Sequence, residues 1–127
     1  MPEIISVFGN PDLSQDSLAI KLLPLLQARL PQFLFSQQNP LEECTPPANQ
    51  KIWWIIDVVK NLKQVKLITN LDQLKSTRQL SLHDYDLGMQ LALIKKINSK
   101  LEIKIIGLPP TGEPAEILES VVTLLTT

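Results

Sequence analysis

Two short apolar runs constrain the fold of this chain more than any other feature. They are "EIISVFG" at residues 3–9 and "KIWWIID" at residues 51–57, and both are rich in β-branched or aromatic side chains. Runs of this length that stop at Gly or Asp are typical of strands buried on both faces of a parallel sheet. We therefore expect the chain to be organised around a buried sheet.

Further strands and three helices are predicted along the rest of the sequence. Residues 32–36, 64–69 and 101–107 have the composition of strands, and apolar residues recur at helical spacing between the strands. The shared helix faces consist of Ala19, Leu22, Leu23, Leu26 and Leu30, of Leu87, Leu91 and Ile94, and of Ile117, Val121 and Leu124. Strands that alternate with helices predict an α/β fold with a mostly parallel sheet of about five strands.

Prolines mark the irregular places in this pattern. Pro24 lies inside the first helical segment, where we expect a kink, whereas Pro114 is well suited to the first position of the last helix. Residues 37–50, "QQNPLEECTPPANQ", contain three prolines and no period. We predict a loop there rather than a linker between domains.

Composition indicates one domain and excludes several partners. The 127 residues are 44% hydrophobic, which is enough for a core, so we expect a single domain over residues 1–127. Twelve basic and thirteen acidic residues leave a net charge of −1, without the basic surface that nucleic acids require. No apolar run approaches the ~20 residues of a membrane helix. We expect a soluble, cytoplasmic monomer whose single cysteine, Cys44, forms no internal disulfide.

Two acidic residues and the only histidine stand where a site is expected. In open parallel sheets, ligands bind beyond the carboxyl ends of the strands. Asp57 ends the second apolar run, Asp16 follows the first run at the start of a helix, and His83 begins the "HDYDLGMQL" helix. If the strands are neighbours, these three residues can meet at one rim. Two carboxylates and one imidazole suit a borderline divalent ion such as nickel or zinc.

Each of these residues also has a plain structural explanation. His83 can cap its helix, and Asp16 can be a helix N-terminal acid that the dipole favours. Asp57 can accept hydrogen bonds from nearby backbone amides, although a carboxylate at the end of a buried strand is costly to desolvate without a partner. The spacing alone leaves both interpretations open.

Four blocks of the sequence, in order, resemble the hydrogenase maturation endopeptidases. "SVFGNPDLSQDSLAIKLL" is similar to their first strand, Gly-Asn turn and acidic helix start, and "IWWIIDVV" is similar to their apolar strand that ends in Asp. "SLHDYDLGMQLAL" resembles their His before a Leu-rich helix, and "EIKIIGLPPTGEP" resembles their last strand and its Gly-x-x-Pro turn. The four blocks span nearly the whole chain.

The resemblance implies a fold, an activity and a set of site residues. The fold would be a three-layer α/β/α sandwich with a twisted sheet. Members of the family cut a C-terminal extension from the precursor of a nickel-containing hydrogenase large subunit after nickel insertion. The residues that contact this nickel match Asp16, Asp57 and His83, and Gly9 and Asn10 of the first turn would contact the substrate. The nickel arrives with the precursor, and zinc or cadmium can occupy the same site.

The sequence shows none of the usual peptidase motifs. It has no H-E-x-x-H helix, and a single histidine excludes most zinc-protease arrangements. Cys44 and His83 have the chemistry of a nucleophile and a base, but Cys44 lies in the proline-rich loop, whose position the sequence does not give. No residue is therefore assigned to the attack on the peptide bond. The alternative hypothesis is a non-catalytic descendant of the family that keeps the fold and binds a metal or a protein partner.

Overall fold

The computed structural model describes residues 3–9, 17–39, 45–59, 62–69 and 82–126, with the backbone alone for Ser17 and residues 82–88. These ranges contain five strands and three helices. Their bounds are β1 (Glu3–Phe8), α1 (Ser17–Arg29), β2 (Phe33–Gln38), β3 (Ile52–Val58), β4 (Lys66–Ile68), α3 (Leu82–Ile97), β5 (Glu102–Leu108) and α4 (Pro114–Thr126). The predicted α/β fold is confirmed.

The five strands form one sheet in the order β2-β1-β3-β5-β4. β2, β1, β3 and β5 run parallel to one another, and the short β4 pairs with β5 in the antiparallel direction. The two apolar runs that dominate the sequence are β1 and β3, and they lie side by side. This central position explains why their side chains are apolar on both faces.

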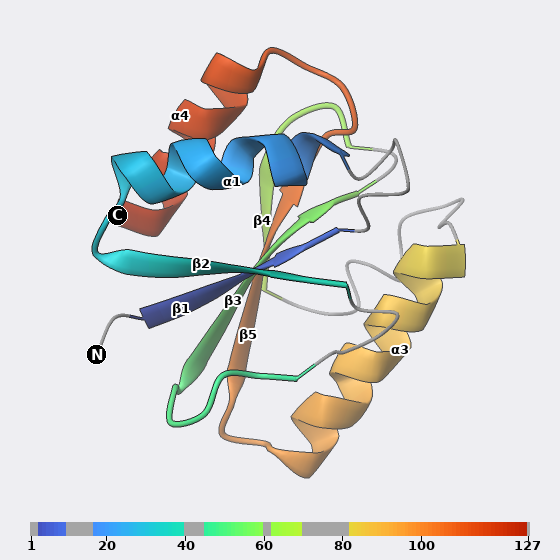
Figure 1. Cartoon of the computed structure of the whole chain (residues 1–127). Helices are drawn as coiled ribbons and strands as arrows, with labels where there is room; N and C mark the ends of the chain where they lie inside the picture. Colours follow the sequence, from blue (N-terminus) through green and yellow to red (C-terminus); the bar gives the residue numbers. More distant parts are fainter. Residues whose placement is uncertain (1–2, 10–16, 40–44, 60–61, 70–81, 127) are drawn as a thin grey trace.

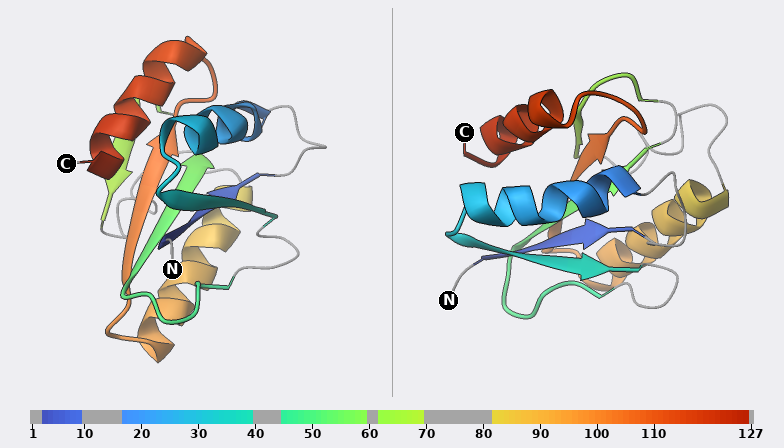
Figure 2. Two further views of the ribbon diagram at one scale, coloured as in Figure 1. Left: turned by 60° about the vertical axis from the view of Figure 1, so that its left-hand side comes forward. Right: turned by 45° about the horizontal axis from the view of Figure 1, so that its top comes forward.

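The helices cover the two faces of the sheet unequally. α1 and α4 lie together on one face, and α3 lies alone on the other, so the molecule has three layers (Figures 1 and 2). Alternate residues of a strand point to opposite faces. In β3, Ile56 and Val58 therefore point toward α1 and α4, whereas Trp53 and Ile55 point toward α3.

Each face has its own apolar core. The core under α1 and α4 contains Leu22 and Val121, both fully buried, and the core under α3 contains Trp53 and Leu91, also fully buried. In α4 the buried residues are Ile117, Val121 and Leu125, and the predicted Leu124 is partly buried against the same core.

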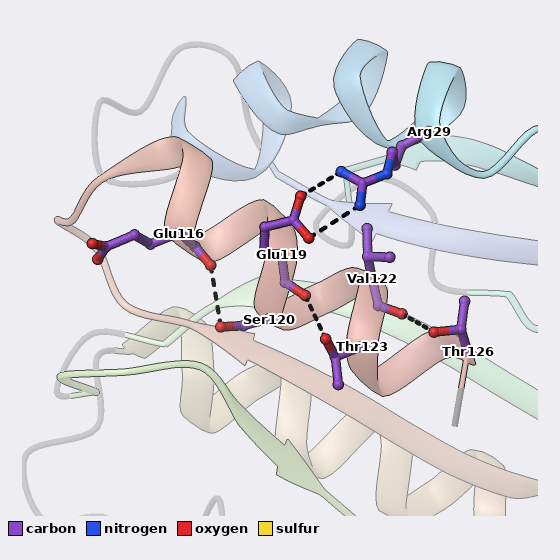
Figure 3. A network of polar contacts seen from close by, with 7 residues as sticks. All are labelled: Arg29, Glu116, Glu119, Ser120, Val122, Thr123 and Thr126. Carbon is purple, nitrogen blue, oxygen red and sulfur yellow. Dashed lines mark hydrogen bonds and ion pairs between the residues drawn. The ribbon is translucent and has the colours of Figure 1, made fainter.

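A bidentate pair joins the two helices that share a face. The guanidinium of Arg29 in α1 donates to both carboxylate oxygens of Glu119 in α4, and the second of these bonds is 3.1 Å long (Figure 3). Both side chains are about half exposed. The hydrogen bond from Arg29 lowers the pKa of Glu119, and the bond to Glu119 raises the pKa of Arg29.

Local sequence explains where the elements begin and end. Pro114 occupies the first position of α4, as predicted, and α1 continues through Pro24 to Arg29. β2 ends at Gln38, two residues beyond the predicted strand, so the expected loop at 37–50 was wrong at its first two residues. Within the described ranges, no helix is long and apolar enough to cross a membrane.

Candidate functional site at the carboxyl edge of the sheet

Asp57 lies at the topological switch point of the sheet. From β1 the chain passes to β2 on one side, and β3 pairs with β1 on the other side. The carboxyl ends of two strands that diverge in this way are where ligands bind in open α/β sheets. Asp57 is the next-to-last residue of β3, and its side chain is only 2% exposed. It follows Ile55 by two residues and therefore points to the α3 face.

The backbone brings the beginnings of two helices to this edge. α1 and α3 both start near the carboxyl ends of the parallel strands and run back along the sheet (Figures 1 and 2). His83 is the second residue of α3, and its side chain lies outside the description. Asp16 directly precedes α1 and also lies outside the described residues. The meeting of these two side chains with Asp57 therefore stays a prediction.

Of the two residues predicted to contact substrate, Gly9 follows the end of β1 at the same edge of the sheet. Gly9 is buried and donates its backbone N–H to the carbonyl oxygen of Gln38 at 3.1 Å, which extends the β1–β2 pairing by one bond. Asn10 lies outside the described residues. Among the described residues, no group of three or more His, Cys, Asp and Glu side chains could hold a metal ion.

A row of residues crosses the sheet at the level of Asp57. Gln38 pairs with Phe8, Asp57 pairs with Gly107, and Gly107 pairs with Lys66. The β1–β3 register, which matches Val7 with Ile56, places Phe8 next to Asp57 when it is continued by one residue. All of these positions belong to the α3 face, because Phe8 packs in the core on that side.

Gly107 gives the row an apolar flank beside Asp57. A Cβ atom at Gly107 would lie 2.7 Å from a terminal methyl of Leu62 and 3.2 Å from a methyl of Val59. Val59 and Leu62 thus pack directly against the glycine, and the Val59 N–H donates to the Leu108 carbonyl at 2.9 Å. Apolar groups therefore lie on the β5 side of Asp57.

Sequence reasoning missed the other members of this row. Gln38 was assigned to a loop, and Gly107 was seen only as part of a turn motif. The signal for Gln38 was its position three residues after the buried Phe35, on the strand face opposite to that residue. This position has a meaning only when the strand is known to continue to Gln38.

Comparison with solved structures gives three close matches in fold. The NiFe hydrogenase maturation protease HybD from Thermococcus kodakarensis superposes with a TM-score of 0.64 and 16% identity, over 98% of this chain and 99% of that chain. The hydrogenase maturating endopeptidase HybD from E. coli gives 0.61 and 15%, over 97% and 91% of the two chains. The fold is similar to that of hydrogenase maturation proteases.

The third structural match and the sequence comparisons show that the similarity lies in the fold. An uncharacterized protein from Wolinella succinogenes has a TM-score of 0.56 and 12% identity, over 98% of this chain and 94% of that chain. No protein-family model matches the sequence, and comparison with curated proteins gives no significant match. The likeness to the HybD proteases, which covers nearly the whole chain, therefore concerns the fold.

Proposed function

We propose that the chain is a processing endopeptidase that removes the C-terminal extension of a nickel-containing hydrogenase large-subunit precursor after nickel has been inserted. In this proposal Asp16, Asp57 and His83 contact the nickel that the precursor carries, and Gly9 and Asn10 contact the precursor itself. The protein would act as a single-domain monomer in the cytoplasm.

The position of Asp57 is the observation that carries the proposal. Its carboxylate is buried at the switch point of a sheet whose fold is shared with two hydrogenase maturation proteases. A divalent cation near a buried carboxylate favours its charged form, because opposite charges attract strongly where water is excluded. The helices that carry His83 and follow Asp16 begin at the same edge of the sheet.

The residues proposed around the ion fit its chemistry. Nickel accepts imidazole nitrogen and carboxylate oxygen, and three protein ligands leave positions for groups of the precursor. The ion supplies Lewis acidity and an anchor for recognition. In this proposal the chain supplies two carboxylates and one imidazole, and its affinity for the ion should fall when the imidazole of His83 is protonated.

Processing is tested with precursor loaded with nickel and with precursor free of nickel. We expect the wild type to shorten only the nickel-loaded form, by the mass of the C-terminal extension, as read by intact mass. Asp57→Asn should abolish the shortening. Glu102→Gln makes the same acid-to-amide change at the exposed first residue of β5, at the opposite end of the strands, and should cut like the wild type. Equal processing of both precursor forms, or by Asp57→Asn, would contradict the proposal.

The same precursor samples distinguish the peptidase from the non-catalytic alternative. A protein that binds a partner without cutting would retain the nickel-loaded precursor in a binding assay while the intact mass of the precursor stays unchanged. A gene for a hydrogenase large subunit with a cleavable tail next to the gene for this chain would favour the peptidase.

A further inference from the structure

Gln38 holds a buried polar atom to which the described residues make no hydrogen bond. It is the last residue of β2, and its backbone is fixed because its carbonyl oxygen accepts the Gly9 N–H at 3.1 Å. Its side-chain Oε1 is buried, and it has no hydrogen-bond partner within the part of the chain that the structure describes. Buried acceptors of this kind are uncommon and destabilising, because the atom has lost water and gained nothing in exchange.

Two other glutamines of this protein show which partner such an amide takes. Gln27 in α1 donates its Nε2 to the Phe33 carbonyl at 2.8 Å and accepts the Phe35 N–H on its Oε1 at 3.1 Å. These are the two bonds that a neighbouring parallel strand would make to β2, so Gln27 occupies part of the outer edge of the sheet.

The side-chain amide of Gln50 likewise makes hydrogen bonds to the backbone at the start of β1. Its Oε1 accepts the Ile4 N–H at 2.7 Å, and its Nε2 donates to the Ile4 carbonyl at 3.1 Å and to the Ile52 carbonyl at 3.2 Å. Both glutamines therefore pair with extended backbone. A primary amide and a peptide group each present one N–H side and one C=O side, so the two are complementary.

The position of Gln38 places it beside the candidate site. Its register partner is Phe8, and Phe8 is the neighbour of Asp57 across the sheet, so one strand separates Gln38 from Asp57. Neighbouring strands are about 4.8 Å apart, which gives about 10 Å between the two positions, and an extended chain covers this in about three residues. A peptide that lies across the carboxyl ends of β2, β1 and β3 would reach both.

We propose that Gln38 is a substrate-binding residue whose side-chain amide pairs with the backbone of an extended polypeptide, about three residues from the group that the polypeptide places at Asp57. The identity of this polypeptide as the tail region of a hydrogenase precursor rests on the proposed function. The unused acceptor of Gln38 is the observation that carries the pairing itself.

Melting temperatures separate this role from a structural one. Gln38→Leu removes the amide at similar volume. We expect its melting temperature to equal or exceed that of the wild type, because Oε1 has no hydrogen bond to any of the described residues. Gln27→Leu is the matched control, and it should melt about 4 °C lower, since two bonds to β2 are removed. A fall for Gln38→Leu as large as that for Gln27→Leu would make Gln38 a structural residue and overturn the proposal.

Binding of the nickel-loaded precursor tests the role directly. Gln38→Leu should weaken the interaction about 5- to 20-fold, read as KM where the protein cuts and as Kd where it only binds. Gln37→Leu changes the adjacent, exposed residue on the other face of β2 and should leave the affinity within about 2-fold. Titration with cadmium alone should give the same affinity for Gln38→Leu and the wild type, because the amide is not an ion ligand.

The outcomes distinguish the two proposals. Wild type that binds and cuts the precursor while Gln38→Leu binds it equally well overturns the role of Gln38 and leaves the peptidase standing. Wild type that binds no nickel-loaded precursor overturns the proposed function, and with it the polypeptide that Gln38 is said to receive.

Discussion

The two faces of the sheet differ in what they bury. The face under α1 and α4 is closed by two helices, and its buried core is apolar. The face under α3 holds both of the buried polar side chains in the described ranges, Ser6 and Asp57, together with the buried acceptor of Gln38. Both faces therefore carry an apolar core, and the candidate chemistry lies on the α3 face alone.

The buried polar side chains of the α3 face lie at different heights along the strands. Ser6 accepts the indole N–H of Trp53 at 2.9 Å, and the Trp53 ring meets Phe8 edge-on, so this pair is satisfied inside the protein. Asp57 and Gln38 lie further along the strands, at the carboxyl edge, where a ligand can approach. The outer side of α3 also exposes apolar side chains to solvent. Met89, Leu93 and Ile97 are each more than half exposed.

The largest loss of stability is expected from a substitution in the core under α1 and α4. Leu22→Ala opens a cavity in the fully buried core under α1 and α4 and should cost about 2–5 kcal/mol of unfolding free energy. Denaturant unfolding measures this loss, and metal titration of the folded fraction should be unchanged. Weaker metal binding per folded molecule would show that the two faces are not independent.

The next largest loss of stability is expected from breaking the hydrogen bond between Ser6 and Trp53 on the α3 face. Ser6→Ala leaves the Trp53 indole N–H buried without its acceptor and should cost about 1–3 kcal/mol. Tryptophan fluorescence should report the changed environment of Trp53 during unfolding. A neutral result would mean that water or a rearranged side chain replaces the hydroxyl.

Asp57→Asn should lower affinity more than stability. The change keeps the shape and removes the charge, so we expect nickel and cadmium to bind at least tenfold more weakly, which is about 1.4 kcal/mol. Without metal, the melting temperature should equal or exceed that of the wild type, because a buried carboxylate is costly to desolvate. Thermal melts of both proteins with and without nickel decide the matter. A large destabilisation without metal, together with an unchanged nickel shift, would remove Asp57 from the site.

The smallest effect belongs to the pair that joins α1 and α4. The pKa of Glu119 is lowered from 4.5 by the hydrogen bond from Arg29, so its contribution is present above pH 4.5 and is lost as the pH falls through the lowered value. Glu119→Gln should therefore lower the stability slightly at pH 7, and the difference from the wild type should disappear as the pH falls below about 4.5. Because both side chains are exposed, the effect is small and should shrink further in high salt. Unchanged acid sensitivity would show that the pair contributes nothing measurable.

The sequence by itself determined the elements and the fold class. The apolar runs of β1 and β3 and the helical spacing of Leu22 and Leu26 are local features. They can be recognised from the order of the side chains alone. Asp57 could be singled out for the same reason, because a carboxylate at the end of "IWWII" contradicts the composition of the strand that carries it. The place of Pro114 at the start of α4 also follows from local backbone chemistry.

Only the tertiary structure decided which residues share a row and a face. The segment "SQQNP" looks like the start of a loop, but pairing with β1 extends β2 to Gln38 and brings that residue beside Phe8 and near Asp57. Strand order and register depend on contacts between segments far apart in the chain, so no local pattern contains them. The same holds for Gln27 and Gln50, whose amides look like ordinary surface groups until the strands they pair with lie next to them.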